Sequence, residues 1–277
     1  ASTLLLGRAL APLEALVSSL KGVQGALAAY RRLRGMQPDA QSPHIERGDT
    51  AIKGRIYLKE VTCYHPQRRL PALRGVSFQL EPGESLGIVG PNGSGKSALA
   101  ALLGGALVPS HGVADLDGLP IAKWQRGEAE VPIGYLPDDP MLIEGTVHEN
   151  IARFRDASLM AVARAAMRAG VHEDLAALPS GYDTPVGPNG SGLSLRERRA
   201  VALARALFGS PRLVILDEPE IGLDGQSVKR LMRVLAALKN EGVGLIIATQ
   251  DLRLMHLTDK VAVMGAVAAI RLLHGRG

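Results

Sequence analysis

The 277-residue sequence predicts an α/β fold with a mostly parallel sheet and helices packed on it. Three observations support this class. Short apolar segments typical of buried strands, residues 85–89, 213–216 and 244–249, are separated by stretches with helical character. A glycine-rich loop follows the first of these segments and leads into a helix. The second segment ends in two acidic residues, Asp217 and Glu218.

The composition excludes several other classes of protein. Hydrophobic residues make up 46% of the chain and charged residues 21%, which excludes a mainly disordered chain. Aromatic residues make up only 3%, so base stacking is not expected and we predict no nucleic-acid partner. The single cysteine, Cys63, excludes an intramolecular disulfide and a cysteine-cluster metal site. The net charge of +5 fits a nucleotide ligand, a membrane-facing surface or simply solvated surface charges.

The N-terminal part of the chain differs from this alternation of strands and helices. Residues 1–34 carry apolar side chains at helical spacing and are interpreted as the end of a last membrane helix, or as an amphipathic helix packed on its own domain. Charged residues interrupt this segment, so it lacks the roughly 20 apolar residues that a membrane span needs. We therefore expect a piece of a longer polypeptide. Residues 35–54, with prolines and glycines, are interpreted as a linker, and residues 55–61 and 76–80 as edge strands.

The glycine-rich loop fits the pattern G-x-x-x-x-G-K-[ST], which is typical of a phosphate-binding loop. Glycines let backbone N–H groups surround a phosphate, and the following helix directs its positive end toward the same anion. Lys96 is expected to contact the β- and γ-phosphates of ATP, and the Ser97 hydroxyl to bind Mg²⁺. The candidate nucleotide-binding residues of the loop are Gly90, Asn92, Gly93, Ser94, Gly95, Lys96 and Ser97.

The two acidic residues at the end of the 213–216 strand complete a candidate catalytic site. In this arrangement Asp217 would support the Mg²⁺ ion. Glu218 would act as the general base that polarises the attacking water. An apolar strand that ends in acids is a weak signal alone, but it becomes strong when a phosphate-binding loop lies upstream.

With these motifs in order, residues 55–265 resemble the ABC ATPase family. The resemblance continues with Leu-Asp-Glu-Pro at 216–219 and Gly-Leu-Asp at 222–224. Two further stretches, 144–154 and 181–187, are similar to the ATPase half of type I protein secretion transporters of the protease and RTX exporter type. The resemblance implies a P-loop fold with a RecA-like core, an antiparallel β subdomain and a helical subdomain over about residues 138–209.

The resemblance also implies a function and partners. It implies an ATP-hydrolysing motor domain, residues 55–277, that drives protein export at the cytoplasmic face of the bacterial inner membrane. Residues 1–34 would then end the last transmembrane or coupling helix of a permease domain. The partners implied are that permease domain, a second ABC subunit in a homo- or heterodimer, a membrane fusion protein and an outer-membrane channel. An ABC-type protein outside transport is disfavoured by the N-terminal helix.

Several positions depart from the family pattern. Residues 193–197 read Leu-Ser-Leu-Arg-Glu, where the family signature reads Leu-Ser-Gly-Gly-Gln. Asp138 stands for the Q-loop glutamine, where it could still coordinate Mg²⁺. Gln250 stands for the switch histidine, where it could still bind a phosphate and serve in catalysis. Pro188 replaces an expected glutamate, and the family register places His65 at the adenine-stacking position.

These departures leave a second function open. In the family, residues matching Ser194 and Asp224 contact the nucleotide and the other subunit across the dimer. Side chains at residues 195 and 196 add bulk where backbone must approach the γ-phosphate, and Glu197 adds negative charge. The alternative to an active exporter motor is therefore a degenerate, regulatory half that binds ATP and pairs with an active subunit.

Overall fold

The computed structural model describes residues 52–64, 70–124 and 132–265 in full, and the backbone of residues 270–274. The expected helix over residues 1–34, nearly all of the linker and His65 lie outside these residues. Residues 51–277 belong to one compact unit. In the described part, no helix is both long enough and apolar enough to cross a lipid bilayer.

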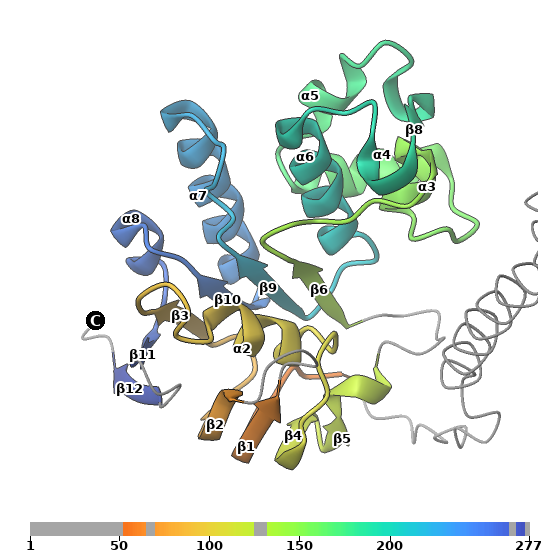
Figure 1. The fold of residues 1–277 in the computed structure, drawn as a ribbon. Helices are drawn as coiled ribbons and strands as arrows, with labels where there is room; N and C mark the ends of the chain where they lie inside the picture. Colours follow the sequence, from red (N-terminus) through yellow and green to blue (C-terminus); the bar gives the residue numbers. More distant parts are fainter. Residues whose placement is uncertain (1–51, 65–69, 125–131, 266–269, 275–277) are drawn as a thin grey trace, which may run out of the picture. The chain divides into compact units, whose positions relative to one another are not determined.

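A six-stranded sheet forms the centre of the fold (Figure 1). Its neighbouring strands pair in parallel, except that the terminal strand β12 is antiparallel to β11. In spatial order the strands are β12 (Ile270–His274), β11 (Lys260–Met264), β3 (Ser85–Val89), β10 (Gly244–Ala248), β9 (Leu213–Asp217) and β6 (Ile133–Leu136). The three strands predicted from apolar segments, β3, β9 and β10, are confirmed as adjacent central strands. Their continuous apolar sequences follow from burial on both faces of the sheet.

A second, antiparallel sheet has the order β2-β1-β4-β5. Its strands are β1 (Ile56–Tyr64), β2 (Pro71–Leu80), β4 (His111–Leu116) and β5 (Leu119–Pro120). The prediction that residues 55–61 form an edge strand is wrong, because Ile56 pairs with Leu80 on one side and with Leu116 on the other. β2 does lie at the edge. The alternate burial of β1 reflects one face packed on the core.

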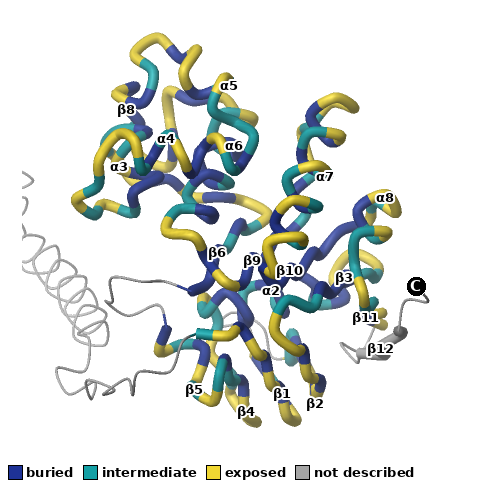
Figure 2. The backbone as a smooth tube through the Cα atoms, turned by 180° about the vertical axis from the view of Figure 1, so that it is seen from behind, coloured by how far each residue is buried: buried dark blue, intermediate teal, exposed yellow. Residues whose placement is uncertain are grey.

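Helices cover both faces of the central sheet. α2 (Lys96–Leu103) packs between the central sheet and the antiparallel sheet, and η1 (Ile121–Lys123) follows β5. α7 (Gly225–Asn240) covers the opposite face. α8 (Leu252–Met255) leads into β11. β9 is buried along its whole length, as the dark blue of the central strands in Figure 2 indicates. Its side chains alternate between the two faces of the sheet, because Val214 and Leu216 belong to one hydrophobic cluster and Leu213 and Ile215 to the other.

A mainly helical subdomain lies between β6 and β9, within the predicted span of residues 138–209. Two capping boxes begin its helices, Thr146 with Glu149 at α3 and Ser194 with Glu197 at α6. The long helices α4 and α6 pack together in the core cluster that α7 also joins. The elements of this helical subdomain are β7 (Gly145–Thr146), α3 (Val147–Ile151), α4 (Leu159–Arg168), α5 (His172–Ala176), η2 (Gly181–Asp183), β8 (Pro185–Val186), η3 (Pro188–Gly190) and α6 (Leu195–Leu207).

Candidate nucleotide site

The predicted phosphate-binding loop connects the end of β3 to the start of α2. Gly93 and Gly95 have φ angles of 79° and 97°, in the left-handed region that favours glycine. A Cβ atom at Gly95 would lie 2.5 Å from the carbonyl oxygen of Ala72, and one at Gly90 would lie 2.5 Å from that of Met264. Glycine is therefore required at both ends of the loop, where backbone segments approach each other closely.

Lys96 holds its ammonium group inside this loop. The side chain is buried, and Nζ donates to the carbonyl oxygens of Gly90 at 2.9 Å and Pro91 at 3.2 Å. Ser94 is also buried, and its Oγ has no hydrogen-bond partner within the described part of the chain. Buried polar groups rarely lack a partner, so the Ser94 hydroxyl indicates a missing ligand. A hydroxyl donor and a buried ammonium group both favour an anion as that ligand.

Asp217 lies at the end of β9 and is fully buried. Burial raises the pKa of its carboxyl group to about 6, an effect that the Ser97 hydrogen bond and the Lys96 charge partly offset. The Oδ1 atom has no hydrogen-bond partner among the residues described. The residues present therefore fit a divalent cation, since a buried carboxylate oxygen beside a serine hydroxyl is left for an oxygen-seeking ion.

Asp138, predicted to bind the metal, lies in the segment that follows β6. Its side chain is exposed, although its charge also raises the pKa of Asp217. Among the described residues, no group of three or more His, Cys, Asp or Glu side chains is arranged to hold a metal. Such a group is not needed for Mg²⁺, which protein sites bind through one or two carboxylates together with phosphate and water.

The remaining predicted residues near the loop come together around Gln250. Its Nε2 donates to Oδ1 of Asn92 at 2.9 Å and makes a longer contact of 3.5 Å with Oε1 of Glu218. The backbone of Glu218 has a φ of 48°, which is uncommon outside glycine, and its N–H donates to the carbonyl oxygen of Ala248 at 2.7 Å. Gln250 thus connects the phosphate-binding loop to the candidate general base.

Ser194 and Asp224, predicted to contact nucleotide and partner across a dimer, are both helix N-caps within the chain. Ser194 caps α6, where its N–H and its hydroxyl both donate to Oε2 of Glu197 at 2.7 Å. Asp224 caps α7 by accepting from the N–H of Ser227 at 2.8 Å. Arg196 contacts Oδ2 of Asp224 at 3.4 Å and Oγ of Ser227 at 3.3 Å.

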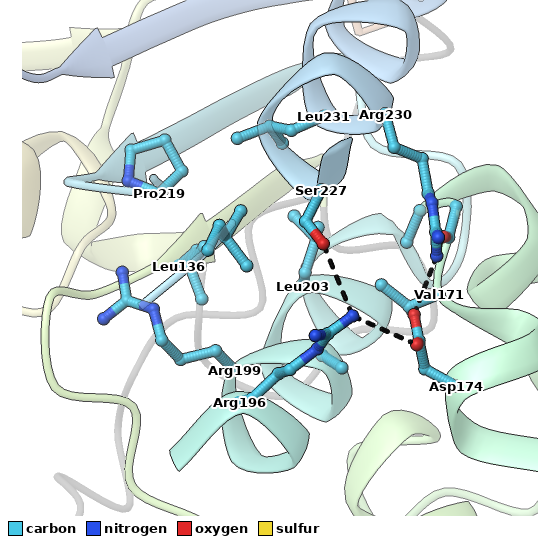
Figure 3. A pocket seen from close by; sticks show the side chains of 14 residues that line it. Leu136, Val171, Asp174, Arg196, Arg199, Leu203, Pro219, Ser227, Arg230 and Leu231 are labelled. Atoms are coloured by element: carbon cyan, nitrogen blue, oxygen red, sulfur yellow. Dashed lines mark hydrogen bonds and ion pairs between the residues drawn. The ribbon is translucent and has the colours of Figure 1, made fainter. Parts of the chain in front are cut away.

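A pocket lies between α6 and α7, apart from the phosphate-binding loop (Figure 3). Its lining is mainly apolar and includes Leu136, Val171, Leu203, Pro219, Leu223 and Leu231. Two arginines of α6 border it, and they leave the helix in different directions. Arg196 turns toward Asp174 and Ser227, whereas Arg199 turns away from them (Figure 3).

Arg199 was not among the sequence-predicted site residues. It is buried, and its guanidinium donates to the carbonyl oxygens of Asp138 and Glu218, which belong to two different candidate site segments. The only signal in the sequence is a basic residue that follows Arg198 and directly precedes the buried Ala200 and Val201 of α6. This signal does not indicate which groups the arginine contacts.

The sheet order, the phosphate-binding loop and the carboxylates at the end of β9 define an ATP-binding domain of the P-loop class. Comparison with known families then specifies this class. The family described as "ABC transporter" matches residues 73–220, more than half of the chain. A second match, to an AAA domain, covers residues 191–256. The chain belongs to the ABC transporter family.

Individual relatives agree with this assignment. The chain is 33% identical over 268 residues to the type I secretion system ATP-binding protein PrsD of Rhizobium meliloti, a match that covers 95% of this chain and 46% of PrsD. It is 37% identical over 218 residues to the cyclolysin secretion/processing ATP-binding protein CyaB of Bordetella pertussis, covering 77% of this chain and 30% of CyaB. The chain spans less than half the length of these relatives.

A solved structure supports the same conclusion. The fold is similar to that of a bacterial Atm1-family ABC exporter with ATP bound, with a TM-score of 0.70 and 28% sequence identity. The match covers 90% of this chain and 44% of the exporter chain. The chain therefore has the sequence and fold of the ATP-binding motor domain of an ABC exporter.

Proposed function

We propose that this chain binds MgATP at residues 90–97 and hydrolyses it to drive protein export by a type I secretion system. The observation that carries the proposal is that Lys96, Ser94 and Asp217 are all buried, that Ser94 Oγ and Asp217 Oδ1 have no partner within the described part of the chain, and that the Lys96 charge acts on the Asp217 carboxyl group. The similarity to PrsD over 95% of the chain supports the secretion assignment.

Each residue of the site has a role that follows from its position. Lys96 and the N–H groups of the loop bind the phosphates, and Ser97 and Asp217 would hold Mg²⁺. That ion would neutralise charge on the phosphate oxygens during bond cleavage. Glu218 takes a proton from the attacking water, and Gln250 keeps the Glu218 carboxylate close to the loop.

The exposed apolar residues of the helical subdomain support a membrane partner. Met141, Ile143 and Phe154 are 54%, 60% and 46% exposed and come from one stretch of sequence between β6 and α4. Exposed apolar side chains are a feature of interaction surfaces when they form a patch, and these three are close in sequence. We assign this surface to a permease domain, with the motor at the cytoplasmic face of the inner membrane and with a membrane fusion protein and an outer-membrane channel completing the system.

Export can be tested in the organism that encodes this chain. Replacing Lys96 with Ala in the full-length protein is expected to remove at least one protein from the culture medium, because phosphate binding is lost. The measurement is proteomic comparison of medium and periplasm with the parent strain and with a Lys229→Ala strain, since Lys229 is exposed on α7. An unchanged set of medium proteins, with altered membrane lipids instead, would contradict the secretion assignment.

A specific observation favours a second candidate, the regulatory half. The N-terminus of α6 is already occupied by an anion of its own chain, because Oε2 of Glu197 accepts both from the N–H and from the hydroxyl of Ser194. Arg196 is held within the chain by Asp174, Asp224 and Ser227. A helix N-terminus attracts one anion well, but a second negative group meets repulsion from the first. We infer that this surface accepts the γ-phosphate of a partner-bound ATP poorly.

Restoration of the family signature tests the second candidate. The combined substitutions Leu195→Gly, Arg196→Gly and Glu197→Gln are expected to raise the ATPase rate of the chain at least about tenfold, since contacts to a transition-state charge are worth that much. The measurement is steady-state ATPase beside an ATP affinity that stays constant. High ATPase activity in the unmodified chain would refute the proposal that this chain is a regulatory half.

A further inference from the structure

Arg199 connects the helical subdomain to two parts of the candidate catalytic site. One guanidinium nitrogen, Nη1, donates to the backbone carbonyl of Asp138 at 2.6 Å. The other, Nη2, donates to the backbone carbonyl of Glu218. The two carbonyl groups lie in separate connections, one after β6 and one after β9. A planar fork of donors can satisfy both at once, which a single ammonium group does less well.

The surroundings of Arg199 make these contacts strong. The residue is only 5% exposed, and a buried charge that lost its partners would be costly. Burial lowers the pKa of the guanidinium, and nearby carboxylates counter this effect. The carboxylates that do so are Asp138, Glu220, Glu218 and Asp217. The arginine therefore stays charged in a site of surplus negative charge.

The backbone of Glu218 needs such support. Its φ of 48° is a left-handed conformation that non-glycine residues rarely adopt, because it brings Cβ close to the backbone. The conformation is held from both sides, because the Glu218 N–H donates to Ala248 and the Glu218 carbonyl accepts from Arg199. The direction of the Glu218 side chain follows from this backbone conformation, and so does its approach to Gln250.

We propose that Arg199 is a positioning residue for the general base: it fixes the backbone of Glu218 and ties it to the Asp138 segment, so that the carboxylate is held for proton transfer. The inference rests on the proposed ATPase function. The hydrogen bonds of Arg199 go to these two segments and not to the phosphate-binding loop, so its loss should affect turnover rather than binding. The Asp138 segment leads within a few residues to the exposed Met141 and Ile143, so Arg199 also joins that surface to the base.

The test compares Arg199→Met with a matched arginine of the same helix. Methionine keeps an unbranched apolar stem, lacks the guanidinium and suits the apolar pocket that Arg199 lines. Arg205 is the control, because it also donates from α6 to a carbonyl of the same segment, but to that of Met141 at 3.0 Å rather than to Glu218. Arg199→Lys keeps the charge and guards against a folding failure of the methionine variant.

Two quantities are measured on the 277-residue chain, steady-state ATPase kinetics and amide hydrogen exchange without nucleotide. Arg199→Met should lower kcat about 10- to 100-fold, as expected for a misplaced catalytic group, with the Kd for ATP within about twofold of the original. Exchange in residues 217–223 should accelerate in Arg199→Met but not in Arg205→Met. Arg199→Lys should fall between the methionine variant and the original chain in both measurements.

Several results would overturn the proposal. An unchanged kcat in Arg199→Met, an equal loss in Arg205→Met, or unchanged exchange over residues 217–223 would each do so. If the original chain does not bind or hydrolyse ATP, the proposed ATPase function is contradicted. The hydrogen-exchange comparison still tests whether Arg199 fixes the backbone of Glu218, because that measurement needs no nucleotide.

Discussion

Lys96→Ala is expected to weaken ATP binding by roughly 100-fold. The ammonium group is buried within the loop and donates to the carbonyl groups of Gly90 and Pro91, partners that the oxygens of a bound phosphate would replace. A charge-assisted hydrogen bond contributes about 1.5–3 kcal/mol, and Lys96 is expected to make more than one to the β- and γ-phosphates. Each 1.4 kcal/mol corresponds to about a tenfold change in affinity.

Titration calorimetry with MgATP and MgADP measures this effect. The loss should be smaller for ADP, because one of the two phosphates contacted is absent. Lys229→Ala is the control, since that lysine is exposed on α7, and both variants should retain the thermal stability of the original chain within a few degrees. Equal ATP affinity in the original chain and in Lys96→Ala would show that the phosphate site is elsewhere.

The sequence predicted the central strands because their environment determines their composition. β3, β9 and β10 are five residues each and buried, so each is a short apolar run that few other structures accommodate. The edge assignment of residues 55–61 failed for the opposite reason. The second neighbour of β1 is β4, whose sequence His-Gly-Val-Ala-Asp-Leu carries little strand signal, and pairing with it depends on tertiary structure.

The residues of the candidate site also separate into those that the sequence predicted and those that it did not. The loop and the two carboxylates are contiguous in sequence and have fixed chemical identities, so a pattern can reveal them. Arg199 could not be found in this manner. Its partners are backbone carbonyl groups 61 and 19 residues away. Every residue has a carbonyl group, so the residue types do not reveal which one accepts the hydrogen bond. The same holds for Arg196, whose contacts with Asp174 and Asp224 depend on how α6 packs beside α5 and α7.

Glu218→Gln is expected to leave ATP binding intact and to lower turnover at least about 100-fold. Glutamine has the shape of glutamate and can keep the contact with Gln250, which lies 3.5 Å from the Glu218 carboxylate. The amide cannot accept the proton of the attacking water, and general-base catalysis contributes about 10²- to 10⁴-fold. Removal of a negative charge near the phosphates should also strengthen ATP binding slightly.

The measurement pairs the Kd for ATP with the steady-state ATPase rate of the chain. Glu241→Gln is a suitable control, because Glu241 follows α7 at its C-terminal end and pairs with Arg168. If the unmodified chain hydrolyses ATP too slowly for comparison, the effect of Glu218→Gln is measured in the chain that carries the three signature substitutions. Turnover that persists in Glu218→Gln at the original rate would assign the proton transfer to another group, and Glu218 would then lose its catalytic role.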